Sequence, residues 1–272
     1  MNLINSAFYE DLADIVILNM NDLNRVLASF LLFKESCKIY CKTDFIVGLF
    51  IHLITCKIPH ILITHHSDYP INNHRYSQKP ACIQKWFAIN VEYKSDDLIP
   101  IPLGTKTPEG REYHESKYKI KWLDFHKDRL KNKEKITDVA YCNWAVTNKS
   151  RAKITEKLEG NIRYKLSSGL SFEDYIEELS SYKYIISPEG NGIDNHRTWE
   201  ALYVGSIPIV TEHLIYDSWK NIPIIQCKDY SDVNIEFLEK KLNNSYSFNE
   251  LSTKYWESYI NNEFLKIQKY AN

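Results

Sequence analysis

Strand-like and helical patterns alternate along the first hundred residues. Residues 14–20 (DIVILNM) and 60–64 (HILIT) are apolar, β-branched runs of strand length. Between them, residues 22–35 start with a capping Asp22 and keep apolar residues at helical spacing, and residues 44–54 repeat that spacing. Strands that alternate with helices predict parallel pairing and an α/β layer.

The second half of the chain repeats this alternation more regularly. It predicts strands at 138–142, 162–166, 184–187, 207–210 and 222–225. It predicts helices at 149–158, 171–180, 196–204 and 235–242, the second of them capped by Ser171. This order is typical of a Rossmann-type sheet. The tail, residues 248–270, has a helical pattern rich in aromatic residues, and we expect it to pack back on the first domain.

A polar, charged segment at 105–135 separates the two halves. Charge runs of this kind usually form solvated faces, so we interpret the segment as a loop and a surface helix that join two domains. The length of 272 residues allows about 1.8 domains at roughly 150 residues each. We therefore expect an N-terminal domain over 1–120, a C-terminal domain over 121–250 and a terminal helix over 251–272.

The composition excludes several classes of protein. The 34 Lys and Arg against 35 Asp and Glu give a net charge of −1, which argues against general nucleic-acid binding, so an anionic ligand needs a local site. The longest apolar stretch, 45–51, is too short to span a membrane, and the acidic N-terminus does not read as a secretory signal. Six cysteines without metal-ligand spacing predict free thiols, hence a cytoplasmic protein.

The segment 182–210 carries the sharpest chemical signal. Glycine is scarce, with eight in the chain, and the single close pair, Gly190 and Gly192, falls here. A predicted strand ends at Ser187, and a helix starts near Asn195. Ligands of open α/β sheets bind beyond the carboxyl ends of strands, and a helix start suits phosphate. Arg197 adds a guanidinium fork that can bind a diphosphate bidentately.

Further residues of the second half are candidates for contacts to the same ligand. Glu200, three residues after Arg197, can accept hydrogen bonds from a ribose diol; alternatively, the two residues form a surface ion pair. The other loop candidates are Ser187, Glu189, Gly190, Asn191, Asp194 and Asn195. After the strand at 138–142, the candidates for phosphate contacts are Asn143, Thr147, Asn148 and Arg151, each of which could equally be a surface residue. The linker aromatics Tyr113, His114, Trp122 and His126 could stack on sugar rings or belong to a core.

The spacing in this segment resembles a known motif. It reads Pro188-x-Gly190, then Arg197-x-x-Glu200-Ala201, then Gly205-x-x-Pro208. This order is similar to the nucleotide-sugar motif of exostosin-like glycosyltransferases and, more loosely, to fucosyltransferases of the two-Rossmann-domain type. Ser206 replaces the usual cysteine, and Asn195-His196 replaces a Ser-Pro-like pair. Weaker similarity covers 86–104 and 141–151.

The resemblance implies a GT-B fold, in which two Rossmann-like domains face a central cleft and the C-terminal one holds the nucleotide sugar. It also implies that Arg197 holds the diphosphate and Glu200 the ribose. Enzymes of this kind do not usually require a metal or another cofactor, and UDP is their commonest donor nucleotide, with GDP as second choice. The sugar would be xylose, glucuronic acid, galactose or an N-acetylhexosamine.

A second group of polar residues follows the predicted strand at 60–64, within 63–76 (ITHHSDYPINNHRY). An inverting transfer needs a base for the acceptor hydroxyl, and Asp68 is our first choice and His66 the second. A metal site is the alternative, built from His65, His66, Asp68 and His74. A plain polar loop is the third interpretation.

We therefore expect an enzyme, a hexosyl- or pentosyltransferase that moves a sugar from a nucleoside diphosphate to a glycan hydroxyl with inversion. Its partners would be the nucleotide sugar and the glycan acceptor, without nucleic acid. Two alternatives remain open, a non-catalytic module that binds a nucleotide or glycan, and a metal-dependent hydrolase built on the histidine cluster.

Overall fold

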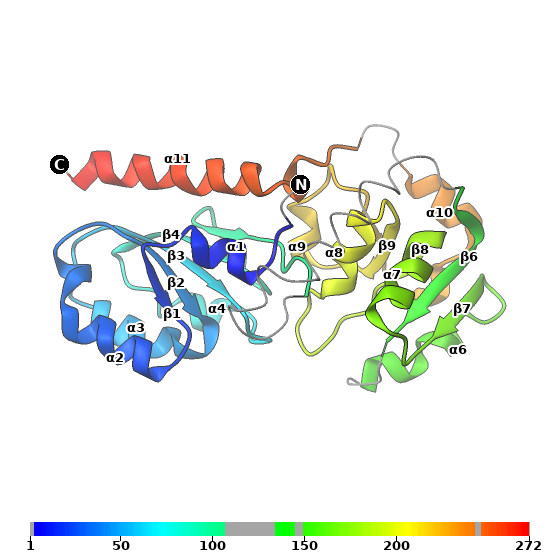
Figure 1. Cartoon of the computed structure of the whole chain (residues 1–272), viewed down its shortest axis with the longest axis horizontal. Coiled ribbons are helices and arrows are strands. Elements are labelled where there is room, and N and C mark those ends of the chain that lie inside the picture. The colour runs from blue at the N-terminus through cyan, green and yellow to red at the C-terminus, as the bar shows by residue number, and fades with distance from the viewer. Residues whose placement is uncertain (1–2, 107–133, 145–148, 243–245, 272) are drawn as a thin grey trace. The chain divides into compact units, whose positions relative to one another are not determined.

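A computed structural model describes residues 3–106, 134–144, 149–242 and 246–271 (Figure 1). The chain divides into two compact units. The N-terminal unit comprises Asn2–Leu103 with Ser252–Asn272, and the C-terminal unit comprises Gly104–Leu251. The division after Leu103 comes earlier than the boundary expected at residue 120. Each unit contains one parallel five-stranded sheet, so the chain is of the α/β class.

The N-terminal sheet keeps its strands in chain order. The strands are β1 (Ile15–Ile17), β2 (Lys38–Lys42), β3 (His60–His65), β4 (Ile83–Ala88) and β5 (Leu98–Pro100), in the order β1-β2-β3-β4-β5. The connecting helices are α2 (Met20–Ser29), α3 (Ile46–Leu53) and α4 (Asn73–Tyr76), with 3-10 turns η1 (Leu31–Phe33) and η2 (Thr43–Phe45). Every residue of β3 is buried, as expected for a central parallel strand covered on both faces.

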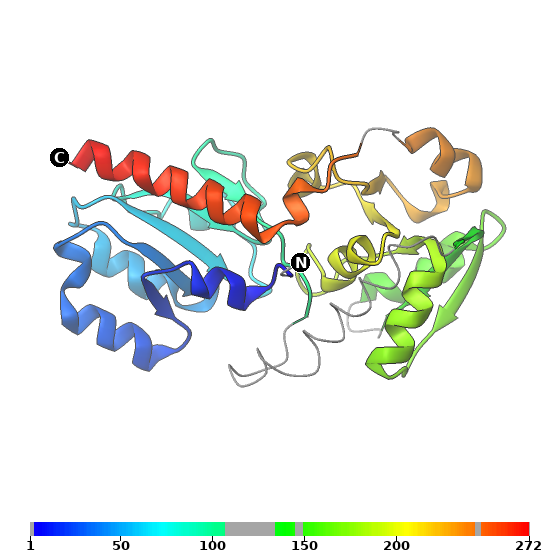
Figure 2. The ribbon, with the colours of Figure 1, turned by 45° about the horizontal axis from the view of Figure 1, so that its top comes forward.

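This strand order has a consequence for how the sheet is covered. Parallel crossovers are right-handed, so an order that never reverses places the crossover helices on one face. The other face is covered by the first and the last helix of the chain, α1 (Ser6–Asp11) and α11 (Thr253–Ala271). Both lie on the side opposite α2 and α3 (Figures 1 and 2). Trp256 and Ile260 of α11 join Tyr9, Tyr40 and Phe87 in one buried cluster.

The helix predicted at 22–35 differs from the observed one at both ends. Asn19 caps α2, because its side chain accepts the N–H of Asp22 at 3.0 Å, and Asp22 lies in the first turn. The helix stops at Phe30, which has φ 54°, and the chain continues as η1. The left-handed Phe30 terminates the apolar helical pattern, a backbone feature that spacing alone does not reveal.

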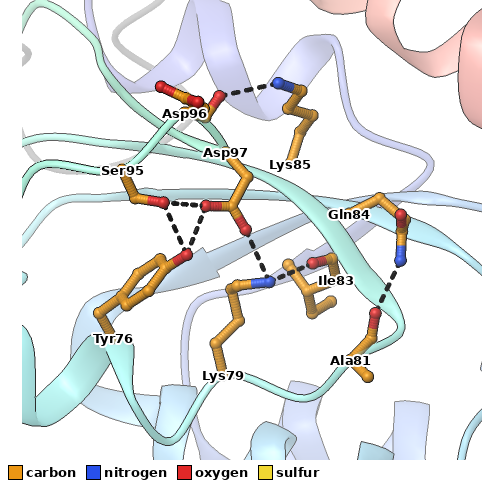
Figure 3. A network of polar contacts seen from close by, with 9 residues as sticks. All are labelled: Tyr76, Lys79, Ala81, Ile83, Gln84, Lys85, Ser95, Asp96 and Asp97. Carbon is orange, nitrogen blue, oxygen red and sulfur yellow. Dashed lines mark hydrogen bonds and ion pairs between the residues drawn. The ribbon is translucent and has the colours of Figure 1, made fainter.

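A polar network joins α4 to the segment before β5 (Figure 3). The carboxylate of Asp97 accepts hydrogen bonds from the hydroxyls of Tyr76 and Ser95 and pairs with Nζ of Lys79 at 3.0 Å. Lys79 also donates to the carbonyl of Ile83 at 2.6 Å. Partial burial raises the pKa of Asp97, but the hydrogen bonds from Ser95, Tyr76 and Lys79 outweigh it and lower this pKa to about 2.

The C-terminal sheet reverses direction. Its strands are β6 (Ile136–Asn143), β7 (Arg163–Ser167), β8 (Tyr182–Ile186), β9 (Ile207–Thr211) and β10 (Ile225–Cys227), in the order β10-β9-β8-β6-β7. The helices are α6 (Ile154–Leu158), α7 (Phe172–Ser181), α8 (His196–Tyr203), α9 (Leu214–Asp217) and α10 (Ile235–Lys241), with 3-10 turns η4 (Lys149–Lys153), η5 (Tyr230–Asp232) and η6 (Asn249–Leu251). This is the doubly wound order 2-1-3-4-5, which confirms the strand and helix order predicted for this half.

Two expectations from composition can be compared with the structure. All six cysteines are free, as their spacing predicted, and all six are buried. Within the described part of the chain, no helix has both the length and the apolar character that a membrane crossing needs.

Candidate anion-binding site

The predicted ligand loop lies where the C-terminal sheet changes direction. β7 lies outside β6, whereas β9 and β10 lie outside β8, so the reversal falls between β6 and β8. A reversal of this kind leaves a crevice beyond the carboxyl ends of the strands, and ligands of doubly wound sheets bind there. The loop 187–195 leads from the carboxyl end of β8 to the first residue of α8.

Ser187 and Asn195 hold the loop and the start of α8 together. Ser187 Oγ donates to Asn195 Oδ1 at 3.0 Å and lies 2.9 Å from Thr198 Oγ1. Asn195 caps α8, accepting the N–H of Thr198, and its Nδ2 donates to the carbonyl of Pro188 at 3.2 Å. Both side chains are buried, and their hydrogen bonds position the loop relative to α8.

Two acidic residues of the loop are also bound internally. Asp194 is buried, and its carboxylate accepts Nε1–H of Trp199, with distances of 2.9 and 2.8 Å to its two oxygens, as well as the N–H of Asn195 at 2.9 Å. Glu189 Oε1 accepts the hydroxyl of Thr211 at 2.9 Å. These contacts fix the loop to α8 and β9. Asn191, by contrast, is exposed at the tip.

Arg151 reaches this loop from η4. Its side chain is buried, Nε donates to the carbonyl of Glu189 at 2.7 Å and Nη2 to that of Pro188 at 3.3 Å. Burial lowers the pKa of the Arg151 guanidinium, and the positive charge of Arg197 lowers it further. An arginine stays protonated at neutral pH, so two positive charges lie within electrostatic reach of one another near the strand reversal.

Arg197, the second residue of α8, has an unused hydrogen-bond donor. Its Nε is buried and has no hydrogen-bond partner. The ion pairs formed by the described residues do not include a pair between Arg197 and Glu200, which was the alternative interpretation of their spacing. An unpaired buried N–H is costly and rare in folded proteins, so Nε of Arg197 is a candidate hydrogen-bond donor to a ligand.

Glu200 is bound within the protein. Its carboxylate is buried; Oε2 accepts the hydroxyl of Tyr175 at 2.8 Å and Oε1 the N–H of Lys106 at 3.3 Å. Burial, then the negative charge of Glu200, raise the pKa of Tyr175 well above its usual value. Each carboxylate oxygen therefore already accepts one hydrogen bond, and a ribose would have to use a second lone pair or replace these donors.

The other candidates of this unit lie nearby or outside the described residues. Asn143 is the last residue of β6, and its Nδ2 donates to the hydroxyl of Tyr141 at 3.0 Å. Thr147 and Asn148 lie outside the described residues. So do the linker aromatics Tyr113, His114, Trp122 and His126.

In the N-terminal unit, His66 follows β3 directly. Its backbone has φ 60°, a left-handed conformation that is uncommon for a residue with a side chain, and its imidazole is exposed. The buried His65 supports this turn: its Nδ1 accepts the N–H of His66 at 2.8 Å, and its Nε2 lies 3.2 Å from the carbonyl of Leu103. Asp68, two residues further on, is exposed.

These contacts argue against His65 as a metal ligand. Because Nδ1 of His65 accepts a backbone N–H, Nε2 carries the proton, and neither nitrogen has a lone pair left for a metal. His74 instead lies on α4, where its Nε2 is 3.0 Å from Nε2 of Gln78. Across the ranges that the structure describes, no group of three or more His, Cys, Asp or Glu residues could hold a metal ion.

Two tyrosines of this site were missed from the sequence. Tyr175 binds Glu200 from α7, and Tyr230 of η5 lies within the electrostatic reach of Arg151 and Arg197. The chain has 19 tyrosines, so residue type alone does not distinguish these two from the others. The available signal was position, since Tyr230 follows the end of β10 by three residues and thus belongs to the ligand-facing edge.

We find no match between this chain and any protein-family model, and none between it and a curated protein.

Proposed function

We propose that the C-terminal unit binds the diphosphate of a nucleotide sugar and that the protein is a glycosyltransferase. The observation that carries the proposal is the arginine pair at the strand reversal. Arg151 and Arg197 repel one another, and Nε of Arg197 is buried without a partner. A dianion between them relieves the repulsion and accepts the unused N–H.

The chemical class of the ligand follows from this charge. Two guanidinium groups and the start of an eight-residue helix suit a diphosphate better than a neutral sugar or a single carboxylate. The resemblance of 182–210 to exostosin-like transferases supports a nucleoside diphosphate sugar, with UDP preferred over GDP. Glu200 would then receive the ribose in addition to its present donors.

The proposed reaction is a single in-line displacement. The acceptor hydroxyl of a glycan attacks C1 of the donor sugar, the new O–C1 bond forms as the bond from C1 to the diphosphate oxygen breaks, and the diphosphate leaves with the electron pair. Arg197 and the start of α8 stabilise the charge on the leaving group. A base accepts the hydroxyl proton, and Asp68 or His66 is proposed for this role. The left-handed backbone of His66 supports a functional assignment, because strained positions cluster at active sites.

Calorimetry tests the proposal directly. We expect UDP and inorganic diphosphate to bind, and uridine, which lacks phosphate, to bind at least tenfold more weakly. A protein that binds none of these and whose melting temperature no nucleotide sugar raises does not have the proposed function. Binding of a nucleotide sugar without transfer to any acceptor would instead identify a non-catalytic binding module.

A further inference from the structure

Tyr230 carries a hydroxyl that the fold leaves without a hydrogen bond. The residue begins η5, shortly after β10, and its side chain is 4% exposed. Its hydroxyl is buried and has no partner. Tyrosine hydroxyls that are buried usually find one, and a phenylalanine would fill the same volume without this cost.

Tyr230 packs in the buried cluster of the C-terminal sheet, which also contains Cys142 and Cys227, and charged groups of the candidate site lie near it. Tyr230 lies within electrostatic reach of both arginines, of Glu189 in the ligand loop and of Cys142 near the end of β6. Two donors at the same edge of the sheet are thus buried and unused, the hydroxyl of Tyr230 and Nε of Arg197. They come from segments far apart in the sequence, and a shared acceptor would give a hydrogen bond to both.

We propose that the Tyr230 hydroxyl is a ligand-binding group that donates a hydrogen bond to the phosphate held by Arg197. This inference rests on the proposed function and adds a residue from the β10 side of the sheet to it. One phosphate oxygen can accept from both donors at once, which would give each of these two buried groups a hydrogen-bond partner.

Binding then involves a local rearrangement, because both donors are buried. We infer that the side chain of Arg151 moves. Its Nε and Nη2 donate to the carbonyls of Glu189 and Pro188, and a phosphate competes with these carbonyls for the same donors. A charged acceptor forms the stronger hydrogen bond.

The opposing interpretation is that Tyr230 is only a core residue with an unfavourable hydroxyl. Tyr40 provides the comparison. It is a fully buried tyrosine of the N-terminal unit whose hydroxyl is also unpartnered, and it lies on β2, away from the arginine pair in the sequence and in a different unit. A structural role predicts that removing either hydroxyl has the same effect.

The experiment compares Tyr230→Phe with Tyr40→Phe in the full chain, by calorimetry with UDP and inorganic diphosphate and by thermal unfolding. We expect both variants to keep or raise the melting temperature, since each loses an unpaired buried hydroxyl. We expect the affinity for both ligands to fall about tenfold or more in Tyr230→Phe and to stay unchanged in Tyr40→Phe.

The outcomes separate this inference from the proposed function. If the unaltered protein binds UDP and diphosphate and Tyr230→Phe binds them equally well, the role of Tyr230 is overturned while the proposed function stands. If the unaltered protein binds neither ligand, both are overturned. If Tyr230→Phe unfolds at a lower temperature than Tyr40→Phe, circular dichroism measures the folded fraction of Tyr230→Phe and of a second variant, Tyr230→Leu. An affinity of that folded fraction equal to the affinity of the unaltered protein again rejects the inference.

Discussion

The guanidinium of Arg151 lies so close to Gly190 that a Cβ atom on Gly190 would be 3.3 Å from Nη2. The absence of a side chain at Gly190 therefore leaves room for the guanidinium of Arg151, which donates hydrogen bonds to the neighbouring carbonyls of Pro188 and Glu189. This contact couples the one close glycine pair of the sequence to the charge of the candidate site.

Gly190→Ala tests this coupling. The added methyl group displaces Nη2 of Arg151 by a few tenths of an ångström, and we expect UDP affinity to fall a few fold with little loss of stability. Calorimetry measures the affinity. Gly160→Ala is the contrasting variant. A Cβ atom added at Gly160 would have no neighbour within 4 Å, but the backbone there has φ +75°, which strains a residue with a side chain. It should lower the free energy of unfolding by about 1 kcal/mol and leave UDP affinity unchanged.

Arg197→Ala removes one of the two positive charges. We expect UDP and diphosphate affinity to fall roughly 10- to 100-fold, because hydrogen bonds to charged groups contribute about 1.5 to 3 kcal/mol. Stability should not fall, since a buried unpaired N–H and a like-charge repulsion are removed together. The matched control is Arg163→Ala, an exposed arginine of the same unit that pairs with Asp138 at 2.8 Å. Equal losses in both variants would contradict the assignment.

Asp68→Asn separates binding from transfer. If Asp68 is the base, donor affinity stays constant and turnover with a glycan acceptor falls by about two to four powers of ten. Initial rates at saturating donor measure this. His66→Gln is made in parallel, since a normal rate in Asp68→Asn combined with a large loss in His66→Gln would transfer the role to the histidine.

Asp97→Asn tests the network in Figure 3 through pH. The pKa of Asp97 is lowered to about 2 in the folded protein, so its ionised form stabilises the fold above the unfolded pKa, about 4. That contribution is lost as the pH falls from about 4 to about 2. Urea unfolding should show Asp97→Asn less stable than the unaltered protein at pH 7, with the gap closing towards pH 2.

Asp138→Asn provides the surface comparison for this pH series. The side chain of Asp138 is 63% exposed in its pair with Arg163, and surface ion pairs of this kind contribute about 0 to 1 kcal/mol. Two results would contradict a dependence of the network on the charge of Asp97. One is a loss of stability at pH 7 that is as large for Asp138→Asn as for Asp97→Asn. The other is a loss of stability for Asp97→Asn that persists at pH 2.

Hydrophobic periodicity predicted the α/β class and the strand and helix order around the candidate site, because buried parallel strands are short, continuous apolar runs. It also placed Ser187, Asn195 and Arg197 at one strand end. It could not predict the internal partners of Asp194 and Glu200, because these depend on Trp199 and Tyr175 meeting them after folding. The end of α2 at Phe30 was missed for a different reason, since its left-handed backbone has no glycine to mark it.

The strand order of the N-terminal sheet also affects the sequence of events during synthesis. One face of that sheet needs α11, and α11 follows the whole C-terminal unit along the chain. The strands of the N-terminal unit therefore emerge from the ribosome early. Phe87 cannot pack against Trp256 and Ile260 until residues 104–251 have also been synthesised. The N-terminal unit is therefore begun before the C-terminal unit and completed after it, and its apolar face lacks the cover of α11 in the meantime.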